Sequence, residues 1–325
     1  MPEGHSVHRL ARQFGDVFTG ARLSASSPQG RFAAGSRRID GRVLESARAH
    51  GKQLFLRFDN DLVLRTHLGL YGAWDFGGDE SFSGASSIGA PRRIGEREIP
   101  DVRGPVGDRP EQDGPFLDGP LPDGASPNRP SPNGRVPYAG PPEPVGAVRV
   151  RLVSDHGWAD LRGPTACEVI TTAEAAAAVA LLGPDPLHNA PADRTEFGSR
   201  LGARGTAIAL LLMDQKVLAG VGNVYRAEVL FRQRLDPWMP GSGLSARQLG
   251  DLWQDIAAAM SDGARDGRII TTLPRHRVSG DLPVPVEEAH YVYKRHGQPC
   301  RICGTDIALT ELANRKLYWC PGCQR

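Results

Sequence analysis

No long apolar run occurs in the 325 residues of this chain. Its apolar stretches fall short of the roughly 18 consecutive residues that a membrane-spanning helix needs. The amino-terminal segment also lacks the apolar core of a signal peptide. We therefore expect no membrane contact, no export and a cytoplasmic location, in a chain long enough for about two domains.

Cysteine is scarce, and its placement excludes a disulfide framework. The chain has five cysteines, four of them within the last 26 residues. The fifth, Cys167, follows an apolar-rich stretch. Because free cysteine behaves as a small hydrophobic residue, we expect Cys167 to be buried and without a chemical role.

The sequence also has little net charge. A formal net charge of +2 is weak for a nucleic-acid-binding protein. Residues 77–147, however, contain eleven acidic and seven basic residues, so the remainder carries about +6. That balance permits DNA binding, although an ordinary solvated surface explains it nearly as well.

Hydrophobic spacing predicts a β-rich first domain that begins with a helix. Val7, Leu10, Ala11 and Phe14 have the spacing of an amphipathic helix, which we expect to end near Gly15. Strand-like texture follows from residue 41 to residue 67 and returns later. The clearest expected strands are residues 53–58, 62–64, 148–153 and 158–161.

Residues 78–146 interrupt this domain. They contain about half of the chain's 27 prolines, many Gly-Pro and Asp-Gly steps and few large apolar residues. Such a composition cannot bury enough surface to offset the loss of chain entropy on folding. We expect a disordered insertion between two strands, with a partner-binding tail as the alternative.

Helical patterning dominates the second half. The expected helices are residues 173–182, 206–213, 224–234 and 245–264. The last begins with a capping-box pair, Ser245 and Gln248. Its apolar residues form one stripe, which we assign to the core: Leu249, Leu252, Trp253, Ile256 and Met260.

The carboxyl-terminal cysteines have the spacing of a zinc site. Cys300 and Cys303 are followed, after 16 residues, by Cys320 and Cys323. Two such pairs can place four thiolates around one Zn²⁺, and a redox pair is the alternative. Four sulfur ligands close the coordination shell, so the metal would be structural and would hold residues 314–316 in a hairpin. Basic residues there would contact phosphate or simply be solvated.

The amino terminus, Met1-Pro2-Glu3, is short but chemically suggestive. Removal of Met1 would leave Pro2 with a secondary α-amine, and α-amino groups have a pKa of about 8. A neutral amine of this kind can attack an acetal-like carbon and form an iminium, and Glu3 could protonate an opening sugar ring. Most proteins that begin in this way use neither residue, so the segment alone does not establish catalysis.

Further motifs accompany this amino terminus. They occur in the following order: Met1-Pro2-Glu3-Gly4-His5, Val7-His8-Arg9, Gly51-Lys52, His67-Leu68-Gly69-Leu70-Tyr71-Gly72, Leu161-Arg162-Gly163-Pro164, Asp214-Gln215, Ala219-Gly220-Val221-Gly222-Asn223-Val224-Tyr225-Arg226-Ala227-Glu228 and the four-cysteine finger. The set resembles the formamidopyrimidine-DNA glycosylase / endonuclease VIII family, and within it the actinobacterial endonuclease VIII-like branch. The resemblance covers nearly the whole chain except residues 78–146.

The resemblance implies catalytic roles for four residues. Pro2 matches the nucleophile that displaces the damaged base at C1′, and Glu3 matches the proton donor in sugar-ring opening. Lys52 matches a lysine that assists catalysis and contacts DNA phosphate. Arg315 matches the zinc-finger arginine that grips the phosphates flanking the lesion and is linked with the second elimination step.

The resemblance also implies contacts with damaged double-stranded DNA. Asn223, after a glycine-rich turn that resembles the helix–two-turn–helix element, would bind phosphate. Leu70 and Tyr71 match the loop that fills the gap left by a flipped nucleotide, and Arg162 is a second filler or strand contact. Endonuclease VIII commonly has glutamine where this chain has Gly69, a departure that concerns the contact to the orphaned base.

The implied fold is α+β with three parts. Residues 1–170 form an N-terminal β-sandwich with an N-terminal helix, interrupted by 78–146. Residues 171–289 form a helical domain with the helix–two-turn–helix element, and residues 290–325 form the zinc finger.

The implied function is that of a bifunctional DNA glycosylase and abasic-site lyase of base excision repair. It would remove oxidised bases, mainly pyrimidines because of the Leu-Tyr pair, through a Pro2 Schiff base with β,δ-elimination. We expect one structural zinc, no redox cofactor, and a bacterial monomer that joins the nucleoid during repair. The alternatives are a glycosylase directed at 8-oxoguanine or formamidopyrimidine, and a non-catalytic abasic-site-binding protein. Intact Pro2, Glu3 and Lys52 argue against the last.

Overall fold

The computed structural model describes residues 2–90, 140–280 and 282–325. These residues divide into two compact units, each with its own hydrophobic core. The first unit contains Pro2 and residues 6–180, and the second contains residues 3–5 and 181–325. None of the described helices is long and apolar enough to cross a membrane.

The first unit is built on one antiparallel sheet. Its strands are β1 (Arg22–Ser26), β2 (Arg42–His50), β3 (Gln53–Phe58), β4 (Leu62–His67), β5 (Ala73–Gly78), β6 (Ser87–Gly89), β7 (Val148–Val153), β8 (Gly157–Arg162) and β9 (Ala166–Thr171). Their order in the sheet is β6-β5-β8-β7-β1-β2-β3-β4-β9. Strand β1 pairs with β2 through its first two residues and with β7 through its last three. The sheet therefore consists of two halves joined at β1.

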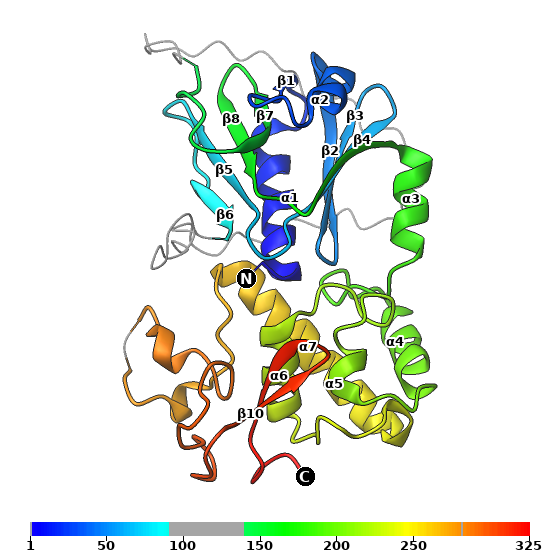
Figure 1. Ribbon diagram of the computed structural model, residues 1–325, viewed down its shortest axis with the longest axis vertical. Helices are drawn as coiled ribbons and strands as arrows, with labels where there is room; N and C mark the ends of the chain where they lie inside the picture. Colours follow the sequence, from blue (N-terminus) through cyan, green and yellow to red (C-terminus); the bar gives the residue numbers. More distant parts are fainter. Residues whose placement is uncertain (1, 91–139, 281) are drawn as a thin grey trace. The chain divides into compact units, whose positions relative to one another are not determined.

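Three helices accompany this sheet, namely α1 (Gly4–Phe18), α2 (Ala33–Ile39) and α3 (Thr172–Ala180). Helix α1 lies between the two halves of the sheet (Figure 1), and its apolar face forms the core with both of them. The ring of Phe14 contacts those of Trp74 and Phe76 edge-on, at centroid distances of 4.9 and 5.1 Å. This arrangement confirms the predicted β-sandwich with an N-terminal helix.

The predicted end of α1 was wrong. The helix continues past Gly15 to Phe18 because Phe18 lies one turn after Phe14 and is fully buried in the same core. A glycine inside a helix costs only about 1 kcal/mol relative to alanine. That cost is smaller than the gain of roughly 1.5–3 kcal/mol from burying a large apolar side chain.

The expected insertion at residues 78–146 falls largely on residues 91–139, which lie outside the described residues. Its predicted start was wrong, because β6 lies within it and pairs with β5 from Ala73 opposite Gly89 to Asp75 opposite Ser87. Expected strands 53–58 and 148–153 match β3 and β7. The expected strand 62–64 extends to His67 as β4.

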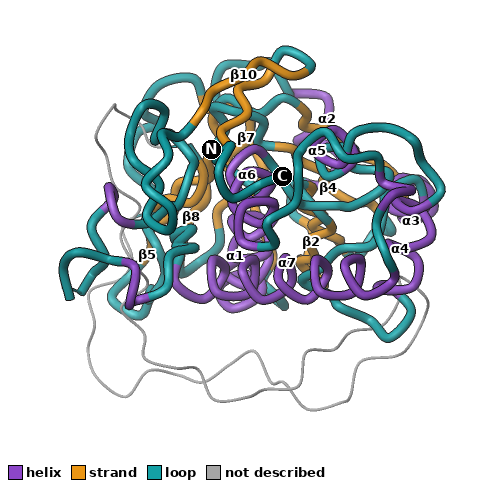
Figure 2. Tube along the Cα trace, turned by 90° about the horizontal axis from the view of Figure 1, so that it is seen from below, coloured by secondary structure: helices purple, strands orange, loops and turns teal. Residues whose placement is uncertain are grey.

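The second unit is helical with a small hairpin. Its helices are α4 (Asp193–Gly202), α5 (Ile208–Leu211), α6 (Asn223–Arg232) and α7 (Ala246–Asp266), with short 3₁₀ turns η1 (Gly241–Gly243), η2 (Pro274–His276) and η3 (Val286–Glu288). Strands β10 (Ala308–Leu312) and β11 (Arg315–Trp319) pair antiparallel. Helix α6 lies beside α7 in both views of the backbone (Figures 1 and 2). The predicted helix 206–213 is only the four-residue α5.

Helix α7 forms as the sequence predicts. Ser245 is its N-cap, and the capping box with Gln248 is present. Leu252, Trp253 and Ile256 on its apolar face are buried in the core of the second unit. Helix α6 packs on this face and is itself almost wholly buried.

Candidate functional site

Glu3 binds the amino-terminal end of α6. Its carboxylate accepts hydrogen bonds from the backbone N–H groups of Gly222, at 2.8 Å, and Val224, at 2.9 Å. The Glu3 side chain is fully buried. Aligned N–H groups at a helix N-terminus stabilise an anion, so the carboxylate is both held in place and compensated electrostatically. Because Pro2 directly precedes Glu3, this anchor also limits the positions that Pro2 can take.

The glycines of the turn before α6 are required by this anchor. A Cβ atom on Gly222 would lie 2.4 Å from Cδ of Glu3. Gly220 has a φ of +90° and accepts a hydrogen bond at its carbonyl from the Gly4 amide, at 2.9 Å. The side-chain oxygen of Gln215 accepts from the Gly220 amide at 3.0 Å. The amino-terminal motif and the glycine-rich motif are thus joined by direct hydrogen bonds.

Asn223, the first residue of α6, links this turn to the zinc finger. Its side-chain Nδ2 donates to the carbonyl of Lys316 at 2.9 Å, and its Oδ1 accepts from the guanidinium of Arg226. Arg226 is fully buried and donates to the same Lys316 carbonyl at 3.1 Å. Burial, together with the nearby charge of Arg315, lowers the pKa of Arg226 to about 10. Arg226 therefore remains charged at neutral pH.

Arg315 lies at the exposed tip of the β10–β11 hairpin. The two-residue turn before it, Ala313-Asn314, has positive φ at both positions, +49° and +58°. Such values are typical of a type I′ turn, which matches the twist of the paired strands. The hairpin predicted for residues 314–316 is present, with Arg315 solvent-exposed and the Lys316 backbone fixed by Asn223 and Arg226.

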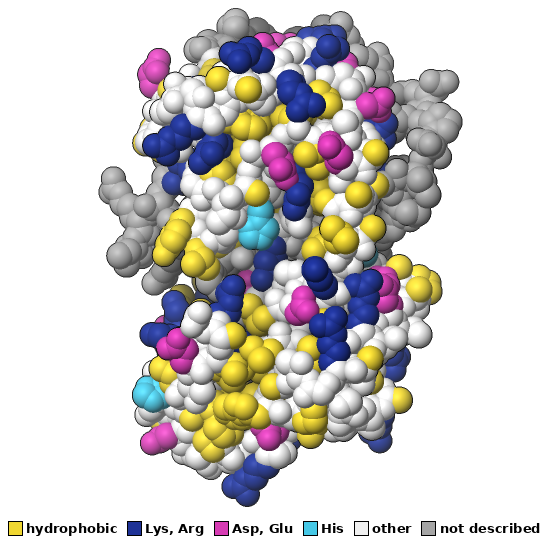
Figure 3. Space-filling view, turned by 45° about the vertical axis from the view of Figure 1, so that its right-hand side comes forward, with side chains coloured by type: hydrophobic (Ala, Val, Ile, Leu, Met, Phe, Trp, Pro, Cys, Tyr) yellow, Lys and Arg dark blue, Asp and Glu magenta, His cyan; other side chains and the backbone are white. Residues whose placement is uncertain are grey.

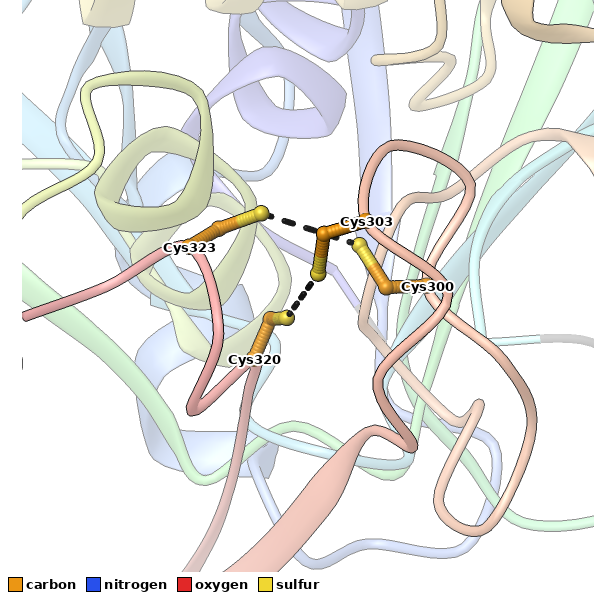
Figure 4. A group of neighbouring side chains, drawn as sticks. All are labelled: Cys300, Cys303, Cys320 and Cys323. Atoms are coloured by element: carbon orange, nitrogen blue, oxygen red, sulfur yellow. Dashed lines mark hydrogen bonds between the residues drawn. The ribbon is translucent and has the colours of Figure 1, made fainter.

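The four cysteines of the finger point toward one another (Figure 4). Their sulfur atoms all lie within 4.8 Å of one another, and the Cys303–Cys320 and Cys300–Cys323 pairs are 3.4 and 3.9 Å apart. Tetrahedral Zn²⁺ with Zn–S bonds of about 2.3 Å requires sulfurs roughly 3.8 Å apart. The arrangement fits one structural zinc ion with a closed sulfur shell.

The backbone around the cysteines is shaped for that site. A Cβ on Gly322 would lie 2.8 Å from the sulfur of Cys303, so only glycine fits there. The side chain of Gln324 accepts from the Cys320 amide at 2.9 Å and donates to the carbonyl of Leu235 at 3.0 Å. The second knuckle is therefore attached directly to the segment that follows the end of α6.

Glu228, the last residue of the glycine-rich motif, lies on α6 and is fully buried. Its buried carboxylate accepts from three successive backbone amides, those of residues 291–293, at 2.8 to 2.9 Å, and from the hydroxyl of Thr271. One of these amides belongs to Tyr293, whose phenol hydrogen-bonds to Asn223. Burial, with Glu3 and Tyr318 nearby, raises the pKa of Tyr293 to about 12.

In the first unit, Lys52 lies in the two-residue turn between β2 and β3. Gly51, the other residue of the turn, has a φ of +58°. The charge of Lys52 acts on His67, the last residue of β4, which pairs with Gln53 across the sheet. Burial, Lys52 and Arg65 together lower the pKa of His67. Lys52 is therefore fixed at one end of the sheet, beside the loop that follows β4.

That loop presents Leu70 and Tyr71 to solvent. The two side chains are 47% and 79% exposed, which is unusual for large apolar residues. The loop is closed by a hydrogen bond from the Gly72 amide to the Leu68 carbonyl, at 2.9 Å. We call residues 68–72 the wedge loop.

Gly69, the position at which the resemblance to endonuclease VIII leads us to expect glutamine, fits only as glycine in this loop. Its φ is +64°, and a Cβ atom there would lie 2.3 Å from Cγ2 of Thr165. The departure from the family pattern thus has a steric reason, because Thr165 occupies the space of a side chain at position 69.

Arg162 forms a bidentate ion pair with Asp75, with Nη2 and Oδ1 3.0 Å apart. Asp75 is 2% exposed. The pair joins β8 to β5 and gives Arg162 a structural role that needs no DNA, so a contact between Arg162 and a DNA strand stays a prediction.

Cys167 is half-buried, whereas the sequence predicted a buried residue. Burial raises the pKa of its thiol to about 12.

Three segments of the chain match known families of domains. Residues 1–95 match the formamidopyrimidine-DNA glycosylase N-terminal domain, residues 182–274 its H2TH domain, and residues 297–325 the zinc finger found in FPG and IleRS. The chain is 40% identical to Endonuclease 8 1 of Mycobacterium tuberculosis over 324 residues, which is 100% of both chains. The chain belongs to the formamidopyrimidine-DNA glycosylase / endonuclease VIII family.

Further relatives and solved structures are similar to this chain. The formamidopyrimidine-DNA glycosylase of Methylococcus capsulatus is 37% identical over 147 residues, 45% of this chain and 53% of the relative. A Lactococcus lactis FPG mutant in complex with Fapy-dG containing DNA has a TM-score of 0.66 at 18% identity, covering 100% of both chains. The MutM (FPG) protein of Thermus thermophilus has a TM-score of 0.64 at 21% identity, covering 99% of this chain and 98% of that one. These structures confirm the α+β fold.

Family membership makes the chain a DNA-repair glycosylase with a structural zinc finger. The second unit brings together Glu3, Asn223 and the Arg315 hairpin around the start of α6. Pro2 and Lys52 belong to the first unit. Sequence reasoning missed the structural roles of Arg226 and Glu228, because most of the groups that they bind are backbone atoms of distant residues.

Proposed function

We propose that the protein is a bifunctional glycosylase and abasic-site lyase that removes oxidised pyrimidines from duplex DNA. The observation that carries the proposal is the anchoring of Glu3 at the amino-terminal end of α6, directly after Pro2. A relative that shares 40% identity over the full length is named Endonuclease 8 1. An anchored terminus supports the use of the Pro2 amine as a fixed nucleophile.

In the proposed reaction the neutral Pro2 nitrogen attacks C1′ of the damaged nucleotide, and the base leaves with the electron pair of the glycosidic bond. The Glu3 carboxylate takes up the proton that the bonded Pro2 nitrogen loses, and it returns this proton to O4′ as the sugar ring opens to an iminium at C1′. Loss of the 3′ phosphate by β-elimination and of the 5′ phosphate by δ-elimination leaves a one-nucleotide gap with phosphates at both ends. Water releases the product and restores the amine.

Phosphate binding is proposed for Lys52, Asn223 and Arg315. The Asn223 amide has a second hydrogen besides the one donated to Lys316, and a phosphate would have to take the place of the Tyr293 phenol as its acceptor. On the face drawn in Figure 3, basic side chains lie among acidic ones. Binding of the duplex therefore depends more on individual side-chain contacts to phosphate than on a uniformly positive surface.

Leu70 and Tyr71 would fill the gap left by the flipped nucleotide, with Arg162 as an additional strand contact. Flipping costs a few kcal/mol of unstacking, and apolar wedges offset part of that cost. The zinc ion would hold the Arg315 hairpin and take no part in the chemistry. We further propose that the protein acts as a monomer at the nucleoid, with domains at residues 1–170, 171–289 and 290–325.

A purine-directed activity is the second candidate. It is favoured by relatives named formamidopyrimidine-DNA glycosylase, such as the one from Methylococcus capsulatus at 37% identity, although they align with less than half of this chain. A non-catalytic abasic-site-binding protein is the third.

Single-turnover excision on matched duplexes tests these candidates. We expect thymine glycol and dihydrouracil to be removed at least tenfold faster than 8-oxoguanine. Faster removal of 8-oxoguanine would replace the proposal with the purine-directed candidate. Binding to abasic DNA without strand cleavage would favour the non-catalytic one.

A further inference from the structure

His67 meets the backbone of the wedge loop through one ring nitrogen. The Gly69 amide donates to Nδ1 of His67 at 3.1 Å, and the hydroxyl oxygen of Thr165 lies 2.7 Å from the same atom. A backbone amide is always a donor, so Nδ1 accepts and carries no proton. The imidazole is therefore neutral, with its hydrogen on Nε2.

Thr165 ties the same histidine to the loop between β8 and β9. Its amide donates to the His67 carbonyl at 2.9 Å, and its hydroxyl donates its one hydrogen to the unprotonated Nδ1, the nearer of its two acceptors. Its methyl group occupies the space beside Gly69. The His67 ring and Thr165 thus form the base on which the wedge loop rests.

The charges around His67 favour the neutral ring. Lys52 acts on it from the β2–β3 turn, and Arg65 acts from its own strand, β4. Arg65 is bound to Gln53 of β3 and forms an ion pair with Glu168 of β9, with Nη1 and Oε1 2.7 Å apart. Burial, Lys52 and Arg65 lower the pKa of His67 from its ordinary value of 6.5.

We propose that His67 is a positioning residue that keeps Leu70 and Tyr71 in their inserting arrangement by accepting the Gly69 amide. This inference rests on the proposed function, in which those two side chains fill the gap beside a flipped nucleotide. Protonation of Nδ1 would place two N–H donors against each other and release the loop. The histidine thereby makes wedge insertion dependent on pH.

The direction of that dependence follows from the lowered pKa. The neutral ring, and with it the contact to the loop, is fully present above pH 6.5. Both are lost only when the pH falls through the lowered pKa of His67 in the folded protein. Excision from duplex DNA should therefore have an acidic limb that begins below 6.5.

Two substitutions separate the hydrogen bond from the charge. His67→Asn keeps an acceptor, Oδ1, near the position of Nδ1 but cannot titrate in this range, whereas His67→Leu has no acceptor. We expect His67→Leu to lower excision from lesion duplexes about threefold to tenfold, which is the effect of one lost hydrogen bond. We expect His67→Asn to stay within about twofold of the parent, by the same measure, and to lack the His67 part of the acidic limb.

A double-mutant cycle shows whether the effect passes through the wedge loop. In a Leu70→Ala, Tyr71→Ala background, His67→Leu should cause no further loss, and borohydride trapping on single-stranded abasic DNA should be unchanged by His67→Leu alone. Additive losses, or equal losses for the Asn and Leu variants at unchanged melting temperature, would overturn the inference. Absence of trapping and excision in the parent protein would instead refute the proposed function.

Discussion

Two buried carboxylates, Glu3 and Glu228, bind backbone amides rather than basic side chains. Glu3 anchors the amino terminus to the start of α6, and Glu228, further along α6, anchors the segment that leads into the zinc finger. Each carboxylate accepts several hydrogen bonds, because a buried carboxylate without such bonds would have a large free-energy cost. Helix α6 is thus attached both to the amino-terminal segment and to the segment that leads into the zinc finger.

Replacement of Glu228 should be severe. Glu228→Gln puts an amide NH₂ against backbone donors, so at least one N–H loses its acceptor, and such a loss costs about 1–3 kcal/mol per group. We expect a loss of about 3 kcal/mol in the free energy of unfolding. Urea denaturation would show it as a lower midpoint at unchanged slope.

Glu311→Gln is the matched control, because Glu311 is exposed on β10. It should change the stability by no more than about 0.5 kcal/mol. Equal midpoints for the two variants would show that the hydrogen bonds of Glu228 contribute little.

At the scale of elements, the wedge loop has the sharpest steric requirement. Gly69→Ala would place a residue with a side chain in a left-handed backbone conformation, which costs about 1–2 kcal/mol. It would also press a methyl group against Thr165. Gly20→Ala isolates the first contribution, since Gly20 has a φ of +83° and nothing within 4 Å of an added Cβ. Thermal unfolding should show a larger loss for Gly69→Ala, and similar losses would mean that Thr165 yields freely.

The zinc finger should control thiol reactivity. With zinc bound, the four finger cysteines are ligands, and Cys167 has a pKa of about 12, so almost no thiolate is available at pH 7. A thiol reagent should therefore label the native protein slowly and label four cysteines after chelation. Cys167→Ser should give the same titration. Rapid labelling of a thiol before chelation that is absent in Cys167→Ser would show that Cys167 is reactive.

For the molecule as a whole, the sequence predicted what depends on local periodicity and on close spacing. Strands β3 and β7, helix α7 with its capping box and the four-cysteine cluster were expected and are present. Short elements without a periodic apolar face were missed. Strand β9 has only one buried residue, Val169, and α2 has seven residues of which two are buried.

The contacts of the candidate site were less predictable. Glu3 meets a glycine 219 positions away, and no local pattern encodes that distance. The resemblance located the motifs but left open why Gly222 and Gly69 are glycines. The structure supplies both reasons, because a side chain at Gly222 would strike Glu3 and one at Gly69 would strike Thr165.

The central claim is that the amine of Pro2 becomes bonded to DNA during the reaction. Borohydride reduction on abasic or lesion-containing duplex should trap a covalent protein–DNA adduct, and mass spectrometry of the digest should place it on the peptide that begins with Pro2. The adduct should disappear in Pro2→Gly and when Met1 or a tag remains in front of Pro2. Trapping that persists with a blocked terminus, or an adduct mapped to a lysine, would contradict the account.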